Sequence, residues 1–184
     1  MLKISRLPHL FFLVVALACS AASLAVDKKT DEAVSFVTQR VTVFGEVEHK
    51  LSLGVAELRR FPLQRIGETN LVCQSGAEAG KLENFVGVRL RDILEKATII
   101  SREHNDLKKT IIIATASDGY KAVFSWNELF NSPLGEGVIV FFEKNGAPLD
   151  DIEGRLAMVS MQDLRTGPRH VRWLQGIEVL RVAQ

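Results

Sequence analysis

The sequence has few cysteines and no excess of either charge. Two cysteines, Cys19 and Cys73, occur in 184 residues, which excludes a small domain held together by several disulfides. The formal net charge is +1, and both signs are mixed along the chain, which argues against a nucleic-acid-binding surface and a polybasic membrane segment. The apolar run at 10–18 is shorter than the ~20 residues that a transmembrane helix needs.

The first 25 residues have the features of a secretory signal peptide in the usual order. Lys3 and Arg6 precede the apolar run 10–18, and small residues follow it. Ser23 and Ala25 take the −3 and −1 positions for cleavage after Ala25. We therefore expect residues 1–25 to be a signal peptide and the mature protein to be periplasmic.

Cys19 offers an alternative fate for the N-terminus. Residues 16–19 read Ala-Leu-Ala-Cys, which resembles a loose lipobox. Lipidation of Cys19 would make the protein an envelope lipoprotein, and this is the one route by which we expect contact with a membrane. After cleavage at Ala25 instead, Cys73 would be the one remaining cysteine, either sequestered in the core or kept for chemistry.

The mature chain has the pattern of one α+β domain with a mixed sheet. Residues 26–40 read as a polar lead-in and the start of the first strand, and 41–182 as the domain. Apolar periodicity and turn signals predict strands at 34–44, 65–73, 110–116, 121–124, 137–142, 156–161 and 176–182, and helices at 52–60, 88–97 and 125–130. The same patterns predict a buried core that includes Leu94, Ile111, Ile113, Val138, Val140 and Phe142.

Several short motifs follow one another in a characteristic order. They are Gly45-Glu46-Val47, Leu51-Ser52-Leu53, Leu71-Val72-Cys73, residues 85–94 (FVGVRLRDIL), Ser117-Asp118-Gly119-Tyr120, Asn145-Gly146-Ala147-Pro148-Leu149 and residues 172–179 (RWLQGIEV). In this order they resemble the oxidoreductase molybdopterin-binding domain of the sulfite oxidase family, over about residues 41–182. The resemblance implies a mixed-sheet fold of the sulfite oxidase type, a molybdopterin cofactor and, at Cys73, the thiolate that ligates molybdenum in active members.

Three departures from the family pattern favour an incomplete molybdenum site. The Gly-x-Pro-x-Arg segment of the enzymes reads Gly154-Arg155-Leu156-Ala157-Met158, so its phosphate-binding arginine is missing. The N-terminal segments that supply cofactor contacts in the enzymes are replaced by a short lead-in, and the signal has no twin arginine. We therefore expect an exported binding or accessory module without a cofactor, whose partner is a small anion, a pterin-like ligand or an envelope protein.

Two alternatives stay open beside that module. One is a molybdenum-dependent oxidoreductase with Cys73 as the metal ligand, and the other is the lipoprotein anchored through Cys19. Enzymatic activity is therefore undecided from the sequence. For Cys73 itself, the alternative to a ligand is an ordinary buried apolar residue, because free cysteine is often buried.

The candidate cofactor-binding residues are Cys73, Asp118, Tyr120, Arg169, His170 and Arg172. The arginines and the histidine crowd a loop around Gly167 and Pro168, where charge-assisted hydrogen bonds could hold an oxyanion or phosphate. The alternatives are a solvated basic loop and, for Asp118, a residue that only forms the turn with Gly119. The acidic stretch 150–153 lacks the spacing of a calcium loop, and we expect it to be a solvated turn.

Overall fold

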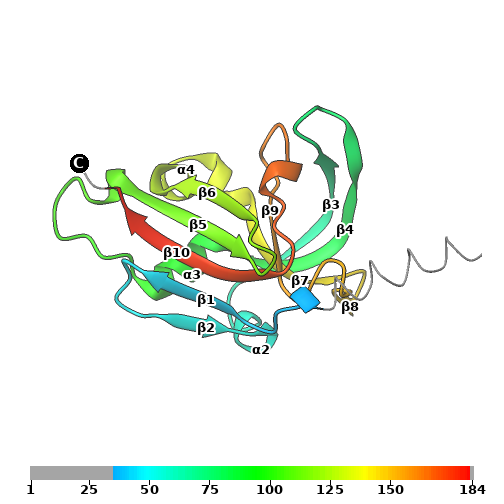
Figure 1. The fold of residues 1–184 in the computed structure, drawn as a ribbon, viewed down its shortest axis with the longest axis horizontal. Helices are drawn as coiled ribbons and strands as arrows, with labels where there is room; N and C mark the ends of the chain where they lie inside the picture. The colour runs from blue at the N-terminus through cyan, green and yellow to red at the C-terminus, as the bar shows by residue number, and fades with distance from the viewer. Residues whose placement is uncertain (1–34, 183–184) are drawn as a thin grey trace, which may run out of the picture.

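Two five-stranded sheets form the framework of residues 35–182, the part of the chain that this computed structural model describes (Figure 1). The first sheet has the order β2 (Leu51–Leu53), β1 (Val41–Gly45), β10 (Leu174–Arg181), β5 (Thr110–Ala116) and β6 (Lys121–Ser125). Its β1 and β10 are parallel, whereas its other pairs are antiparallel. The expected α+β class with a mixed sheet is confirmed.

The second sheet is antiparallel and carries the longest hairpin of the fold. Its order is β3 (Leu63–Val72), β4 (Glu78–Arg89), β7 (Val138–Lys144) and β8 (Ala147–Pro148), and β9 (Ala157–Ser160) also pairs with β7. Figure 1 shows β3 and β4 curving together away from the body of the molecule. The position of this hairpin determines one wall of the site described below.

Short helices connect the strands. They are α2 (Val55–Leu58), α3 (Leu90–Ala97) and α4 (Trp126–Phe130), with 3-10 turns η1 (Leu107–Lys109), η2 (Pro133–Gly137) and η3 (Gly167–Arg169). In α4, Ser125 and Glu128 form a capping box in which the Ser125 hydroxyl accepts the N–H of Glu128. The sequence signal for this helix is confirmed.

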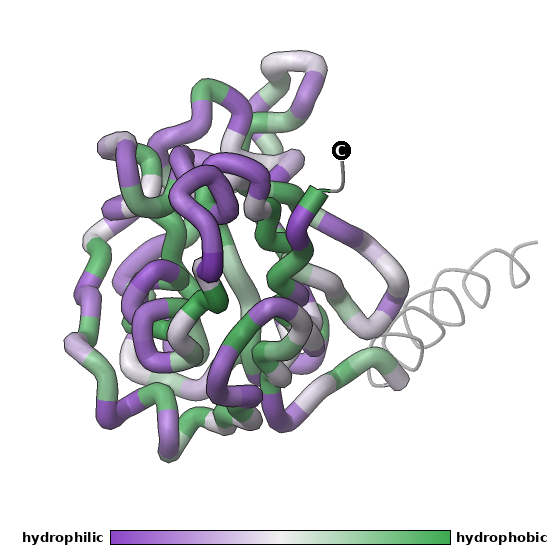
Figure 2. Tube along the Cα trace, turned by 90° about the vertical axis from the view of Figure 1, so that its left-hand side faces the viewer, coloured by the Kyte–Doolittle hydropathy of each residue, from purple (hydrophilic) through white to green (hydrophobic). Residues whose placement is uncertain are grey.

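The apolar residues form two clusters on opposite faces of the second sheet. The larger lies between the sheets and includes the buried face of α3, which is Leu90, Ile93, Leu94 and Ala97. The smaller includes Phe85, Ile139, Phe141 and Val159. In Figure 2 hydrophobic stretches run through the interior, and much of the surrounding chain is hydrophilic. The larger cluster joins the two sheets into one unit.

The structure corrects several predicted boundaries. The first strand begins at Val41 and not at residue 34. The predicted helix 52–60 is a strand, Leu51–Leu53, followed by a single turn of helix, because Gly54 rather than Ser52 is the N-cap and the Glu57 carboxylate accepts the Gly54 N–H. A strand that was not predicted, β4, begins at Glu78. Cross-strand pairing with β3 extends this strand beyond its local apolar pattern.

The predicted core residues are buried in α3 and β7 but not in β5. Leu94, Val138, Val140 and Phe142 are buried as expected. Ile111 and Ile113 are only half-buried, because the other face of β5, which includes Ile112 and Ala114, points into the core. Successive side chains of a strand point to opposite sides, so the two isoleucines lie on the opposite face from the core.

The expectations about export and Cys19 concern residues 1–34, which lie outside the described residues. Between residues 35 and 182, no helix is long and apolar enough to span a bilayer. Both export and lipidation therefore remain predictions from the sequence.

Candidate functional site

The tip of the β3–β4 hairpin carries Cys73. The Cys73 N–H donates to the Ala77 carbonyl at 2.8 Å, and the Cys73 carbonyl accepts the Gly76 N–H at 2.9 Å, so the backbone is fixed in a tight turn. The side chain of Cys73 is exposed and is a free thiol. The alternative of a cysteine sequestered in the core is therefore wrong, because the turn lies beyond the region where the hairpin packs on the smaller cluster.

The opposite wall is the segment that runs from η3 into β10. Val171 is fully buried and pairs with Met158 through two backbone hydrogen bonds of 2.7 and 2.8 Å. His170 and Arg172, on either side of it, line the pocket. Trp173 follows with a positive φ of 50°, and its indole N–H donates to the Asp151 carbonyl at 2.8 Å. These contacts fix the two basic side chains at the pocket.

The turn between β5 and β6 supplies the third side. The Asp118 carboxylate accepts the Tyr120 N–H at 2.9 Å, and Gly119 has a φ of 91°, which is the geometry that favours glycine. The Tyr120 hydroxyl donates to the Pro168 carbonyl at 2.7 Å and joins this turn to η3. Asp118 therefore shapes the turn, as one of the two interpretations expected, and it also lines the pocket.

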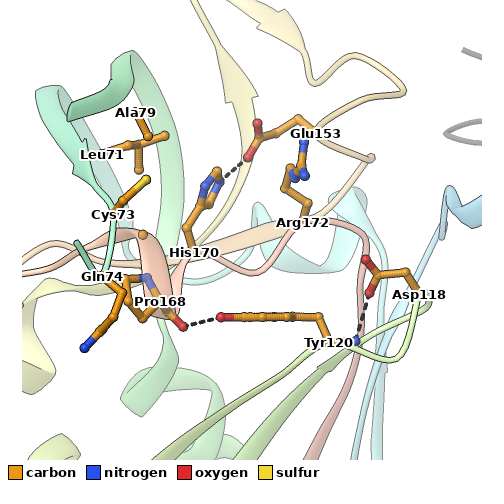
Figure 3. A pocket seen from close by; sticks show the side chains of 11 residues that line it. Leu71, Cys73, Gln74, Ala79, Asp118, Tyr120, Glu153, Pro168, His170 and Arg172 are labelled. Atoms are coloured by element: carbon orange, nitrogen blue, oxygen red, sulfur yellow. Dashed lines mark hydrogen bonds and ion pairs between the residues drawn. The ribbon is translucent and has the colours of Figure 1, made fainter. Parts of the chain in front are cut away.

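These three segments, together with Glu153, line an open pocket of about 680 Å³. Figure 3 shows the thiol of Cys73 on the hairpin side and His170, Arg172 and Tyr120 across from it. Pockets of 300–1,000 Å³ commonly hold small molecules or cofactors. The residues that line it are Leu71, Cys73, Gln74, Ala79, Asp118, Tyr120, Glu153, Gly167, Pro168, His170 and Arg172.

His170 is held by a carboxylate that the sequence patterns did not identify. Its Nε2 contacts Glu153 Oε1 closely, and the two side chains are only 11% and 12% exposed. The imidazole also stacks on Phe141, with 6.2 Å between ring centroids. Glu153 is thus a wall residue and not part of a solvated acidic turn. No local signal pairs residues 153 and 170, because the fold alone brings them together.

Arg172 and Arg169 have different environments. Arg172 lies over the Trp173 ring at 4.9 Å and has no carboxylate partner among residues 35–182. Arg169 is bound by Asp163, through Nε at 2.6 Å, and by Glu128 at 3.0 Å, and it covers the Phe124 ring at 4.5 Å. Burial lowers the pKa of Arg169, but the hydrogen bonds to Asp163 and Glu128 raise it by more than burial lowers it. The net pKa is therefore above the ordinary value.

The structure therefore brings five of the six candidate residues together. Cys73, Asp118, Tyr120, His170 and Arg172 line one pocket, whereas Arg169 is not among the lining residues. The Gly-x-Pro-x-Arg positions Leu156 and Met158 are fully buried apolar side chains and supply no cation to the pocket. Among the described residues, no cluster of three or more histidine, cysteine or acidic side chains has the geometry of a metal site.

The protein is a two-sheet α+β domain whose hairpin presents a cysteine to the pocket, and comparison with known proteins names its family. The family model described as the oxidoreductase molybdopterin binding domain matches residues 28–184. The chain belongs to this family. Its fold is that of the sulfite oxidase type, as the sequence motifs led us to expect.

A solved structure with a similar fold is the sulfane dehydrogenase SoxCD from Paracoccus pantotrophus. The TM-score is 0.58 at 19% sequence identity. The match covers 76% of this chain and 37% of that chain, so the present sequence spans little more than a third of its length. No curated protein sequence matches this chain.

Proposed function

We propose that this domain binds a molybdopterin-type ligand in the pocket between the β3–β4 hairpin and η3. The observation that carries the proposal is the position of Cys73, whose exposed thiol faces the same pocket as Arg172. A thiolate is a soft ligand suited to such metals, and a guanidinium that has no carboxylate partner among residues 35–182 suits a phosphate or another oxyanion. The family to which the chain belongs supports the same ligand class.

The residues present offer such a cofactor one group at each end. Cys73 would hold the metal and Arg172 the phosphate, while Tyr120 forms a side wall. His170 is bonded to Glu153, and Arg169 to Asp163 and Glu128. When bound, the cofactor itself supplies the redox chemistry, and the protein supplies orientation and electrostatics. Among residues 35–182, Arg172 is thus the one pocket-lining arginine that is left for an anion.

This balance favours a binding or accessory module with an incomplete molybdenum site, consistent with the missing arginine at Met158. The second candidate is a molybdenum-dependent oxidoreductase, and the exposure of Cys73 within the pocket is the specific observation in its favour. From the N-terminal sequence, the proposal also includes a periplasmic location and an envelope protein as a partner.

The experiment is to isolate the full chain from its native host and to measure bound pterin by fluorescence and molybdenum by elemental analysis. Arg172→Gln should lower pterin occupancy about tenfold or more, because a charge-assisted bond is lost. Arg60→Gln is the matched control, since Arg60 is exposed and is not among the residues that line the pocket.

The outcomes separate the candidates. Pterin without stoichiometric molybdenum supports the binding module. Pterin with molybdenum that is lost in Cys73→Ser supports the oxidoreductase. Neither pterin nor molybdenum in the native protein, or occupancy insensitive to Arg172→Gln, would overturn the proposal.

A further inference from the structure

Thr166 connects the two main walls of the pocket through one hydroxyl group. It is only 5% exposed. Its Oγ1 accepts the Val72 N–H at 2.9 Å and donates to the Asn70 carbonyl at 2.6 Å. Val72 and Asn70 belong to β3, which is the edge strand of its sheet. The hydroxyl therefore forms the hydrogen bonds that a neighbouring strand would otherwise make with the backbone N–H and carbonyl of this edge strand.

The same residue begins the opposite wall. The Thr166 carbonyl accepts the Arg169 N–H at 3.2 Å and so closes η3. Gly167 follows, and a Cβ at this position would lie 2.9 Å from the Val72 carbonyl oxygen. Only glycine allows the two walls to approach this closely without a shift. Thr166 and Gly167 together form the contact between η3 and the strand that leads directly into Cys73.

Apart from Thr166 and Gly167, the Arg165 guanidinium packs against the hairpin turn, because a Cβ at Gly76 would lie 2.9 Å from Arg165 Nη2. Gly67, Glu68, Asn70 and residues 78–81 are exposed, and the space beside Gly67 and Gly80 is open. Leu71 and Leu82 pack on the smaller cluster and form its apolar anchor. Segments with few buried contacts open locally at low free energy. The hydroxyl contact of Thr166 is therefore one of the few contacts that set the position of the tip.

We propose that Thr166 is a positioning residue that holds the outer part of the β3–β4 hairpin, and with it Cys73, against η3. The contact keeps the thiol facing Arg172 and His170 across the pocket. The expected effect of this contact on ligand retention rests on the proposed function. The contact itself can be measured in the protein without any ligand.

Hydrogen exchange of the full chain tests the contact. In Thr166→Val, which removes both hydrogen bonds at nearly constant volume, amides of the outer hairpin around residues 69–71 and 79–82 should exchange about tenfold faster or more. Amides around residues 63–66 and in β5 should keep their rates. Thr166→Ser, which keeps the hydroxyl, should restore the slow exchange.

The control is Thr110→Val, which makes the same chemical change in the other sheet. Thr110 is 1% exposed and its hydroxyl donates to the Asp106 carbonyl at 2.9 Å. This variant should leave the hairpin rates unchanged. If Thr166→Val does not fold, Gly167→Ala provides a second perturbation, because its Cβ would push Val72 away while the hydroxyl remains. It should also accelerate exchange of the outer hairpin.

A second readout follows Cys73 directly. In Thr166→Val, reaction of the thiol with a bulky maleimide should accelerate several-fold more than reaction with iodoacetamide, and Thr166→Ser should behave as wild type. Pterin content of protein from the native host should fall in the valine variant. Unchanged outer-hairpin exchange in both Thr166→Val and Gly167→Ala would overturn the proposal. If the wild type holds no pterin but exchange responds as expected, the proposed function fails and the positioning role stands.

Discussion

Replacing Arg169 with glutamine is expected to destabilise the fold and to leave the pocket able to bind an anion. Its guanidinium contacts both oxygens of Asp163, a side chain that is only 11% exposed, and Glu128 at 3.0 Å. Arg169 itself is 19% exposed. Removing it leaves the Asp163 carboxylate partly buried and unpaired, and the Phe124 ring uncovered.

The magnitude follows from these contacts. Breaking a fully buried ion pair costs about 3–5 kcal/mol, whereas an exposed pair contributes about 0–1 kcal/mol. The partial burial of Arg169 and Asp163 places the expected loss between these limits, at about 2–4 kcal/mol. For a domain of this size, that loss lowers Tm by roughly 4–16 °C.

Urea denaturation measures the loss, and phosphate titration by calorimetry measures binding in the same variants. Arg172→Gln should show the opposite behaviour, with a small change in stability and weaker phosphate binding. The double variant Arg169→Met/Asp163→Leu should recover much of the stability, since both charges are removed together. A loss below about 0.5 kcal/mol in Arg169→Gln, combined with weaker phosphate binding, would refute the reasoning. It would show that Arg169 is an anion-binding residue.

Three further predictions concern the rest of the chain. Leu94→Ala should cost about 2–5 kcal/mol in chemical denaturation, because Leu94 is fully buried in the larger cluster; a loss under 1 kcal/mol would contradict its placement. Backbone N–H groups of Glu103 and Arg102 hold the pKa of Asp106 below its usual range. The ionised Asp106 therefore stabilises the folded state above the unfolded pKa of about 3.9, and this stabilisation is lost as the pH falls below that value. Asp106→Asn should flatten the acid limb of a stability–pH curve. N-terminal mass spectrometry of envelope protein should find Val26, or a lipidated Cys19 in the alternative, and an intact Met1 would exclude both.

Glu128 adds to the same acid limb by a different balance of causes. Partial burial raises the pKa of Glu128, but the Ser125 N–H and the Arg169 guanidinium lower it by more than burial raises it. The net pKa therefore lies below its ordinary value. Its contribution is therefore present above about pH 4.3 and is lost on acidification. Arg169→Gln should weaken this part of the pH dependence as well.

Local chemistry made much of the fold predictable. The helix at 90–97 has apolar residues at one-face spacing, and α4 begins with the capping pair Ser125 and Glu128. Turn residues at Asn145 and Gly146 have positive φ values of 53° and 75°, which their residue types tolerate. These features depend on a few neighbouring residues, so a single sequence is sufficient to find them.

The site was only partly predictable, because it depends on contacts between distant segments. The motif order indicated Cys73, Tyr120 and Arg172, but Glu153 reaches His170 from 17 residues away and Thr166 reaches Asn70 from 96 residues away. Neither contact leaves a periodic or local trace in the sequence. The loop 165–172 also looked uniformly basic, and only the fold shows that Asp163 and Glu128 neutralise one of its arginines.

The strand β5 shows where a hydrophobic pattern is ambiguous, and it yields a last prediction. Residues 111–113 are three consecutive isoleucines, so both faces of the strand are apolar and alternation cannot select the buried one. Pairing with β10 and β6 orients Ile112 into the core, where it is fully buried, and leaves Ile113 half-buried. Ile112→Ala should therefore cost about 2–5 kcal/mol and Ile113→Ala about 1 kcal/mol. A larger loss at Ile113 than at Ile112 in urea denaturation would show that the register of this strand is shifted by one residue, and equal losses would contradict the placement of Ile113 outside the core.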